Sequence, residues 1–227
     1  MKTHGIPTIL AFTAAVLPAT GGDHATNHAT KKEPLPAITL RVLNQAQIDE
    51  RVLEKAKEEA TAMLGRAGVG LVWVDCGASI ADSKDKEPCQ GARGRAEFWM
   101  RLTNDRPAWA SKENLGFTQL AGEDGSAGVY YPAVLNSAQR FVHYGNGIAP
   151  VIVFTPYFLG AAIVHEIGHL ILGAHSHTPS GVMCAEWGRE QLESISTGKL
   201  SFARDQVKPL QIEVRRRLSE GQPSQRR

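Results

Sequence analysis

An apolar run that contains two histidines and a glutamate constrains the fold most. It reads GIAPVIVFTPYFLGAAIVHEIGHLILG, from 147 to 173, and passes through Pro156 into a predicted helix that ends near Gly173. The flanks AAIV and LILG favour a buried helix. Burying two imidazoles and a carboxylate costs on the order of several kcal/mol unless a partner replaces their lost hydration. The sequence therefore predicts that the domain folds around a partner for these groups.

His165 and His169 have the spacing that a metal ion requires. Positions four apart on a helix project from one face, so two imidazole nitrogens can each reach a single zinc ion at about 2 Å. Glu166 is not needed as a ligand, and we expect its carboxylate to act as general base on a water that the zinc acidifies. The plain alternative is three polar residues on an ordinary helix, which the apolar flanks disfavour. We expect one Zn²⁺ ion.

Two histidines are candidates for the third metal ligand. A catalytic zinc usually has three protein ligands and one open position. Gly173 can end the helix in a left-handed conformation and turn the chain back, which brings either His175 or His177 toward the metal. We favour His177, because it lies four residues past the glycine and reaches the metal more easily than His175, which lies two past it. The unbound histidine would be an ordinary loop residue.

This stretch resembles the signature of the metzincin metallopeptidases, HExxHxxGxxH followed by a turn that contains a methionine. The motif maps onto His165, Glu166, His169 and His175, with Met183 in SGVM as the turn methionine.

One position departs from that signature. Leu172 stands where the family has its turning glycine, and the glycine follows one residue later. The longer run HEIGHLILGAHSHTPSGVM is also similar to a group of exported bacterial metzincin-like proteins, in which the third histidine corresponds to His177.

The resemblance implies an α+β fold. Its parts would be a twisted mixed β-sheet with packing helices, a zinc-site helix, a methionine turn and a C-terminal helix. It also implies that an edge strand lines the cleft and binds a peptide substrate as an added strand. GVYYPAV is our candidate for that edge. Tyr130 or Tyr131 can assist a developing oxyanion, although a tyrosine in a strand more often packs.

Hydrophobic patterns predict the other elements. They are a strand at 37–44, a helix within 45–68, a largely buried strand at 69–76, a strand at 95–104, two short strands at 115–120 and 128–136, and a closing helix at 202–221 interrupted at Pro209.

The N-terminus is typical of an export signal. Lys2 precedes the apolar stretch from Gly5 to Leu17, which ends in small residues. We therefore predict a signal peptide at 1–22, a linker at 23–36, a domain at 37–220 and a disordered tail at 221–227. A disordered N-terminus of a cytosolic protein is the alternative. No later segment is expected to span a membrane, and the mature protein is expected to be secreted or periplasmic.

The three cysteines fit an oxidising compartment. Cys76 and Cys89 flank a polar loop, so a disulfide between them is the economical interpretation in an exported protein. Cys184 is left over; we favour an inert thiol over an intermolecular bridge or a metal ligand.

The function that these patterns favour is an exported zinc-dependent endopeptidase acting on a peptide or protein. The formal net charge is +2, and the Lys and Arg residues are scattered along the sequence. This pattern gives no reason to expect nucleic acid or a membrane surface as a partner. One rival is a non-catalytic binding or scaffold protein with a structural zinc, closed by Cys184 or the spare histidine. Another is a zinc hydrolase that acts on a non-protein amide.

Overall fold

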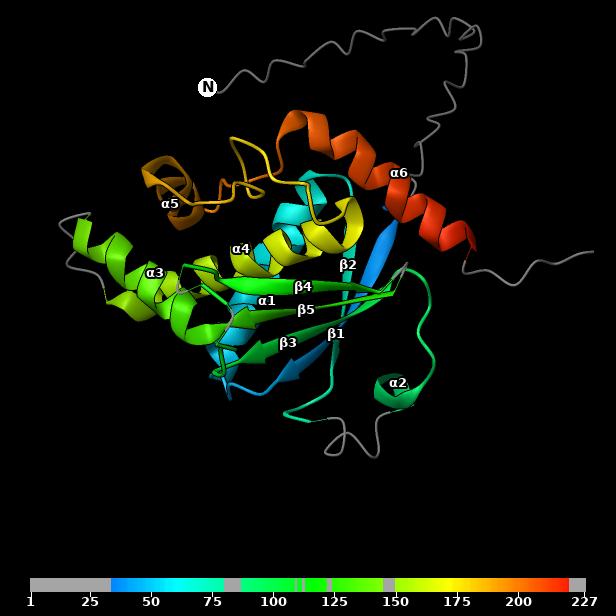
Figure 1. The fold of residues 1–227 in the computed structure, drawn as a ribbon, viewed down its shortest axis with the longest axis horizontal. Coiled ribbons are helices and arrows are strands. Elements are labelled where there is room, and N and C mark those ends of the chain that lie inside the picture. The colour runs from blue at the N-terminus through cyan, green and yellow to red at the C-terminus, as the bar shows by residue number, and fades with distance from the viewer. Residues whose placement is uncertain are drawn as a thin grey trace, which may run out of the picture. The chain divides into compact units, whose positions relative to one another are not determined.

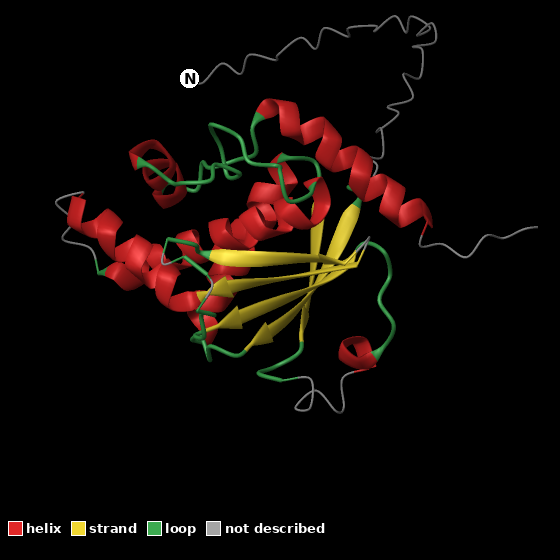
Figure 2. Cartoon of the chain, in the orientation of Figure 1, coloured by secondary structure: helices red, strands yellow, loops and turns green. Residues whose placement is uncertain are grey.

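A five-stranded mixed sheet organises the part of the chain that the computed structural model describes, which is residues 34–79, 87–108, 110–111, 113–121, 124–144 and 150–220. Helices accompany the sheet, so the predicted α+β class is confirmed (Figure 2). The predicted signal peptide, nearly all of the linker and the C-terminal tail lie outside the described residues.

The strand order is β2-β1-β3-β5-β4. Neighbouring strands run parallel except β4, which pairs antiparallel with β5 and forms one edge of the sheet. The strands are β1 (Ala37–Asn44), β2 (Gly70–Asp75), β3 (Glu97–Thr103), β4 (Gly116–Ala121) and β5 (Asp124–Tyr130).

Two long helices, α1 and α4, lie side by side against one face of the sheet (Figure 1). The helices are α1 (Glu50–Arg66), α2 (Glu87–Gln90), α3 (Tyr131–Tyr144), α4 (Val151–Leu172), α5 (Arg189–Ser196) and α6 (Arg204–Glu220). The long pair is α1 and α4, and Gly160 permits their close approach because an added Cβ there would lie 2.8 Å from the Ala56 carbonyl oxygen.

The main core lies between this helical layer and the sheet. Alternate residues of β1, namely Ile38, Leu40 and Val42, are at most 1% exposed and face the helices. The opposite face of the sheet carries a smaller cluster around a disulfide between Cys76 and Cys89, which confirms the predicted pairing.

The predicted edge strand is wrong. GVYYPAV does not form an edge, because β5 ends at Tyr130 and lies between β3 and β4. The predicted strand at 128–136 is helical from Tyr131 onward. Pro132 fits the first turn of a helix, and Val134, Ala138 and Phe141 recur at helical spacing toward the core. The true edge next to α4 is β4, whose existence the sequence predicts.

Two prolines lie inside helices, and only the helix with Pro209 is predicted to be interrupted. Pro156 is in α4 and Pro209 is in α6, and both helices continue through them. Each proline lies in the second turn, where its missing N–H removes a single helical hydrogen bond. The remaining bonds of each helix hold it together.

One further expectation needs correction. The strand β2 is an edge strand with Val72 49% exposed, so it is not largely buried.

The helix α4, with a mean hydropathy of 1.6 over its apolar window, is long and apolar enough to cross a membrane by length and composition. However, 67% of that window is buried inside the protein, as is typical of a core helix.

Candidate metal centre

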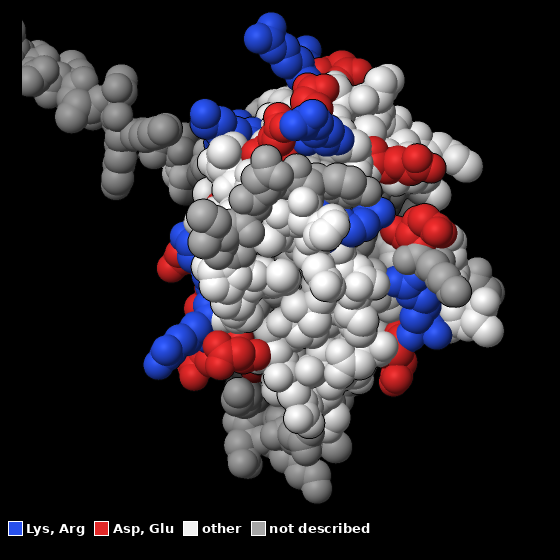
Figure 3. Space-filling view, turned by 90° about the vertical axis from the view of Figure 1, so that its left-hand side faces the viewer, with Lys and Arg blue, Asp and Glu red and all other residues white. Residues whose placement is uncertain are grey.

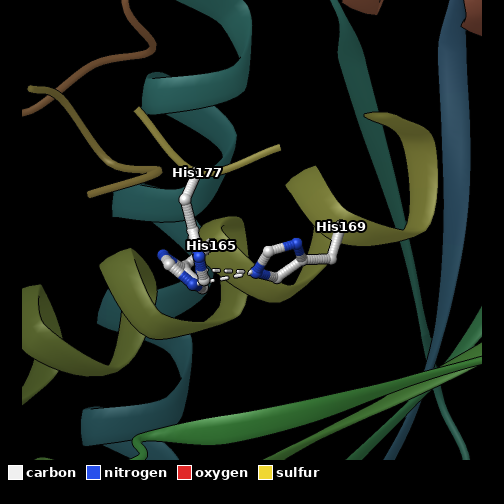
Figure 4. Close-up of side chains that lie close together, drawn as sticks. All are labelled: His165, His169 and His177. Atoms are coloured by element: carbon white, nitrogen blue, oxygen red, sulfur yellow. Dashed lines mark hydrogen bonds between the residues drawn. The ribbon is translucent and has the colours of Figure 1, made fainter. Parts of the chain in front are cut away.

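Three histidine side chains meet at the C-terminal half of α4. The Nε2 atom of His169 lies 3.1 Å from Nε2 of His165 and 3.1 Å from Nε2 of His177. Figure 4 shows the three rings turned toward one another, two from α4 and one from the segment that follows it. In the described residues, these three side chains form a group that can hold a metal ion.

The other nitrogens of the α4 histidines fix which ring nitrogen carries the proton. Nδ1 of His165 lies 2.8 Å from the carbonyl oxygen of Val182, and Nδ1 of His169 lies 3.2 Å from that of Gly173. A carbonyl oxygen only accepts, so both Nδ1 atoms carry hydrogen and donate. The two Nε2 atoms are therefore unprotonated and lie 3.1 Å apart, an arrangement that a shared cation would stabilise.

Burial disfavours the charged form of both α4 imidazoles. Burial lowers the pKa of His165 to about 4, although its hydrogen bond to Val182 acts in the opposite direction and the neighbouring histidines lower the pKa further. Burial also lowers the pKa of His169. Protonation of either α4 imidazole is therefore disfavoured, whereas a bound metal ion would accept the lone pairs of all three histidines.

Two of the three nitrogen separations are close to those of tetrahedral coordination. Ligand nitrogens about 2.05 Å from a tetrahedral zinc are about 3.3 Å apart. Nε2 of His169 lies 3.1 Å from each of the other two Nε2 atoms, and all three ligand nitrogens lie within 4.8 Å of one another. Carbonyl acceptors behind the ligating imidazoles are also the usual second layer of a metal site.

The chain turns back to the metal centre at Gly173. Its φ of 93° and ψ of 172° lie in a region that only glycine adopts readily. The turn brings His177 to the two α4 histidines and leaves His175 exposed and outside the group. The structure therefore groups His177, and not His175, with the two α4 histidines. Which of the two binds a metal stays a prediction.

Met183 lies beneath the helix that carries the histidines. It is fully buried, and an added Cβ at Gly168 would clash with its sulfur atom. Gly168, between the two α4 histidines in sequence, thus leaves room for this methionine. The loop after α4 therefore packs against α4 itself.

Gln206 of α6 holds the loop that delivers His177. Its side chain is buried, and its Nε2 donates to the carbonyl oxygen of Ser176 at 2.7 Å. The hydroxyl of Ser176 in turn lies 3.1 Å from Nδ1 of His169 and donates to the Gly173 carbonyl oxygen at 2.7 Å. One buried amide therefore anchors the residue next to the third histidine.

Replacing Gln206 with leucine is expected to weaken metal binding by about 10- to 100-fold, the usual effect of losing an outer-layer contact. Gln211→Leu is the matched control, because Gln211 lies on the same helix and donates to the Ala67 carbonyl oxygen at 2.9 Å, away from the ligand loop. Competition with a coloured chelator measures affinity, and melting of the metal-free proteins measures stability. Equal metal affinities in the two variants, at equal stability, would contradict the role of Gln206.

Glu166 is buried beside the histidines and held by the edge strand. It is 5% exposed, and its Oε2 accepts a hydrogen bond from the Thr118 hydroxyl at 2.7 Å. Burial raises the pKa of its carboxyl to about 7, against the opposing effect of the Thr118 hydrogen bond. Gly116 leaves space for the carboxylate, since an added Cβ would lie 2.7 Å from Oε1. Near this pKa the carboxyl can both release and take up a proton.

A cleft of about 730 Å³ exposes this constellation. The edge strand β4 lies along it, and the three histidines and Glu166 line it. Figure 3 shows the side on which α3 and α5 lie, whose centre is largely uncharged while charged side chains gather around its rim. The site is therefore open to a ligand much larger than water.

Neither predicted oxyanion tyrosine is among the described residues that line the cleft. Tyr130 is 1% exposed and its ring centroid lies 5.6 Å from that of Phe117, while the Arg106 guanidinium lies 5.0 Å from the Tyr130 ring. Tyr131 packs against the main core. The packing interpretation of both residues therefore holds.

Sequence reasoning missed Thr118 and Gln206. Each lies far along the chain from the histidine motif, 48 residues in the case of Thr118 and Glu166, and carries no local signal. No protein-family model matches the chain, and no curated protein or solved structure matches it significantly. The interpretation of the site therefore rests on its geometry and chemistry.

Proposed function

We propose that this protein is an exported, zinc-dependent endopeptidase of metzincin-like architecture. One observation carries the proposal: three converging imidazole nitrogens lie in an open cleft that a buried glutamate also lines. A structural zinc site is usually closed by four protein ligands, whereas a catalytic one keeps a position open. Three histidines with an adjacent carboxylate are typical of a catalytic zinc site.

Zinc is the metal that this donor set suits best. Imidazole nitrogens also accept copper, iron and nickel, but three histidines around an open tetrahedral position are the usual catalytic zinc set. When bound, zinc would supply Lewis acidity toward a scissile carbonyl and acidify water.

The chain's own residues would then move the proton. Thr118 donates a hydrogen bond to Oε2 of Glu166 at 2.7 Å, whereas Oε1 has no hydrogen-bond partner within the described residues. Oε1 is thus the atom that takes a proton from the attacking water. Glu166 then gives this proton to the leaving amine as the C–N bond breaks. The products are a shortened peptide with a new carboxylate and a peptide with a new amine.

The edge strand β4 favours an extended peptide as substrate. One side of β4 pairs with β5, and β4 lines the cleft with Gly116, Thr118 and Leu120. An edge strand offers unpaired backbone groups to which an extended chain can add as a further strand. A peptide bound in this way would lie across the metal centre.

The disulfide between Cys76 and Cys89 supports the export proposal, because disulfides persist in oxidising compartments.

The proposal is tested by metal analysis together with cleavage of a mixed peptide library. We expect about one zinc ion per chain, loss of cleavage on chelation, and recovery on addition of zinc. Mass spectrometry of the products identifies the cleaved bonds. A zinc-loaded protein that cleaves no peptide in the library would overturn the peptidase function.

A further inference from the structure

A second cavity, of about 360 Å³, adjoins the cleft. Phe141 of α3 and Leu192 of α5 line it, with Trp187 from the segment before α5. Arg140, Trp187 and Leu192 line both the cavity and the cleft, so the two spaces share a wall. The cavity is a side pocket of the cleft with a largely apolar lining.

Trp187 places this side pocket next to the metal centre. Its ring stands edge to face with the His165 ring, with centroids 6.1 Å apart. Its Nε1 donates to the Val182 carbonyl oxygen at 3.3 Å, and the same oxygen accepts from Nδ1 of His165 at 2.8 Å. A substrate group bound in the side pocket is therefore close to the bond presented to the metal.

Arg140 lies at the junction of pocket and cleft, where Glu113 and Glu186 also line the cleft and Glu193 the pocket. Within the described residues its guanidinium makes no hydrogen bond and no ion pair. The other arginine at the pocket, Arg189, is bound through Nε to Glu193 Oε1 at 3.0 Å. Arg140 is thus the arginine left to bind an incoming anion.

We infer that the side pocket binds an apolar side chain of the substrate and that Arg140 binds an acidic side chain two residues away. This inference rests on the proposed function. In an extended peptide successive side chains point to opposite sides, so residues two apart share a side. With an apolar residue in the pocket, a carboxylate on the same side lies two positions along, whereas one on the adjacent residue points away. The substrate class is therefore a peptide with an apolar and an acidic residue separated by one position.

The inference is tested with matched peptides that carry one apolar residue, with glutamate or glutamine placed one or two positions from it on either side. All have blocked termini, and one further peptide has a free C-terminus. Binding to zinc-loaded Glu166→Gln protein is measured by fluorescence anisotropy, and kcat/KM is measured with the unmodified protein. We expect about a three- to tenfold preference for glutamate over glutamine at the position two away, and none at the adjacent position.

Arg140→Gln should abolish that preference, and Arg140→Glu should reverse it. Arg189→Gln is the matched control and should leave the ratio unchanged. A preference that survives in Arg140→Gln, or that appears only with the free C-terminus, would overturn the inference. If no peptide is cleaved, the proposed function fails, while the binding measurements still decide the role of Arg140.

Discussion

Replacing Glu166 with glutamine is expected to leave zinc binding intact and to lower kcat for a cleaved peptide by on the order of 10²- to 10⁴-fold. Glutamine keeps the shape of the side chain and its contact with Thr118, whose hydroxyl donates to Oε2 at 2.7 Å in the present protein. It cannot take a proton from water. Zinc content and single-turnover cleavage of the same preparation measure the two properties.

Glu190→Gln is a suitable control for that variant, because Glu190 is an exposed acid in the first turn of α5. We expect it to match the unmodified protein in both assays. Cleavage by Glu166→Gln at the unmodified rate would show that Glu166 has no catalytic role.

Replacing His177 with alanine is expected to weaken zinc binding by more than about 100-fold and to abolish cleavage, because it removes one of three ligands. His175→Ala is the matched control. It removes an exposed imidazole two residues earlier, outside the group formed by the other three. We expect its zinc affinity to stay within about threefold of the original. Chelator competition measures both.

Two other outcomes for the zinc affinities of these variants would change the assignment of the third ligand. A large effect of His175→Ala with a small effect of His177→Ala would restore the standard metzincin spacing, with Leu172 tolerated at the turn. Large and equal effects would mean that both histidines bind the metal. The site would then be closed, which favours the structural zinc of the rival interpretation.

Local signals explain why the sequence predicts so much of this site. The spacing of His165 and His169 requires only that the segment is helical, which its apolar flanks indicate. Gly173 marks the helix end, and its positive φ is a conformation that few other residues adopt. Once the helix ends there, the chain length to His177 follows from counting residues.

The edge of the sheet was not predictable in the same way. Which strand becomes the edge depends on pairing between strands, and here β4 folds back onto β5 with Gly116 opposite Val129. Tyr130 and Tyr131 look alike in the sequence, yet the first ends a strand and the second begins a helix. Thr118 and Gln206 reach the site through tertiary packing, which leaves no pattern near the histidine motif.

X-ray absorption spectroscopy of the zinc-loaded, unmodified protein tests the central claim most directly, because it reads the ligands of the metal without an assay of activity. Three imidazole nitrogens and one oxygen, at about 2.0–2.1 Å, are expected. Cys184, the free cysteine of the described residues, also lines the cleft, with its Sγ 3.2 Å from the Glu186 carbonyl oxygen, and would be the source of a closing thiolate ligand. A sulfur at about 2.3 Å, or a fourth imidazole, would contradict the open site and with it the peptidase.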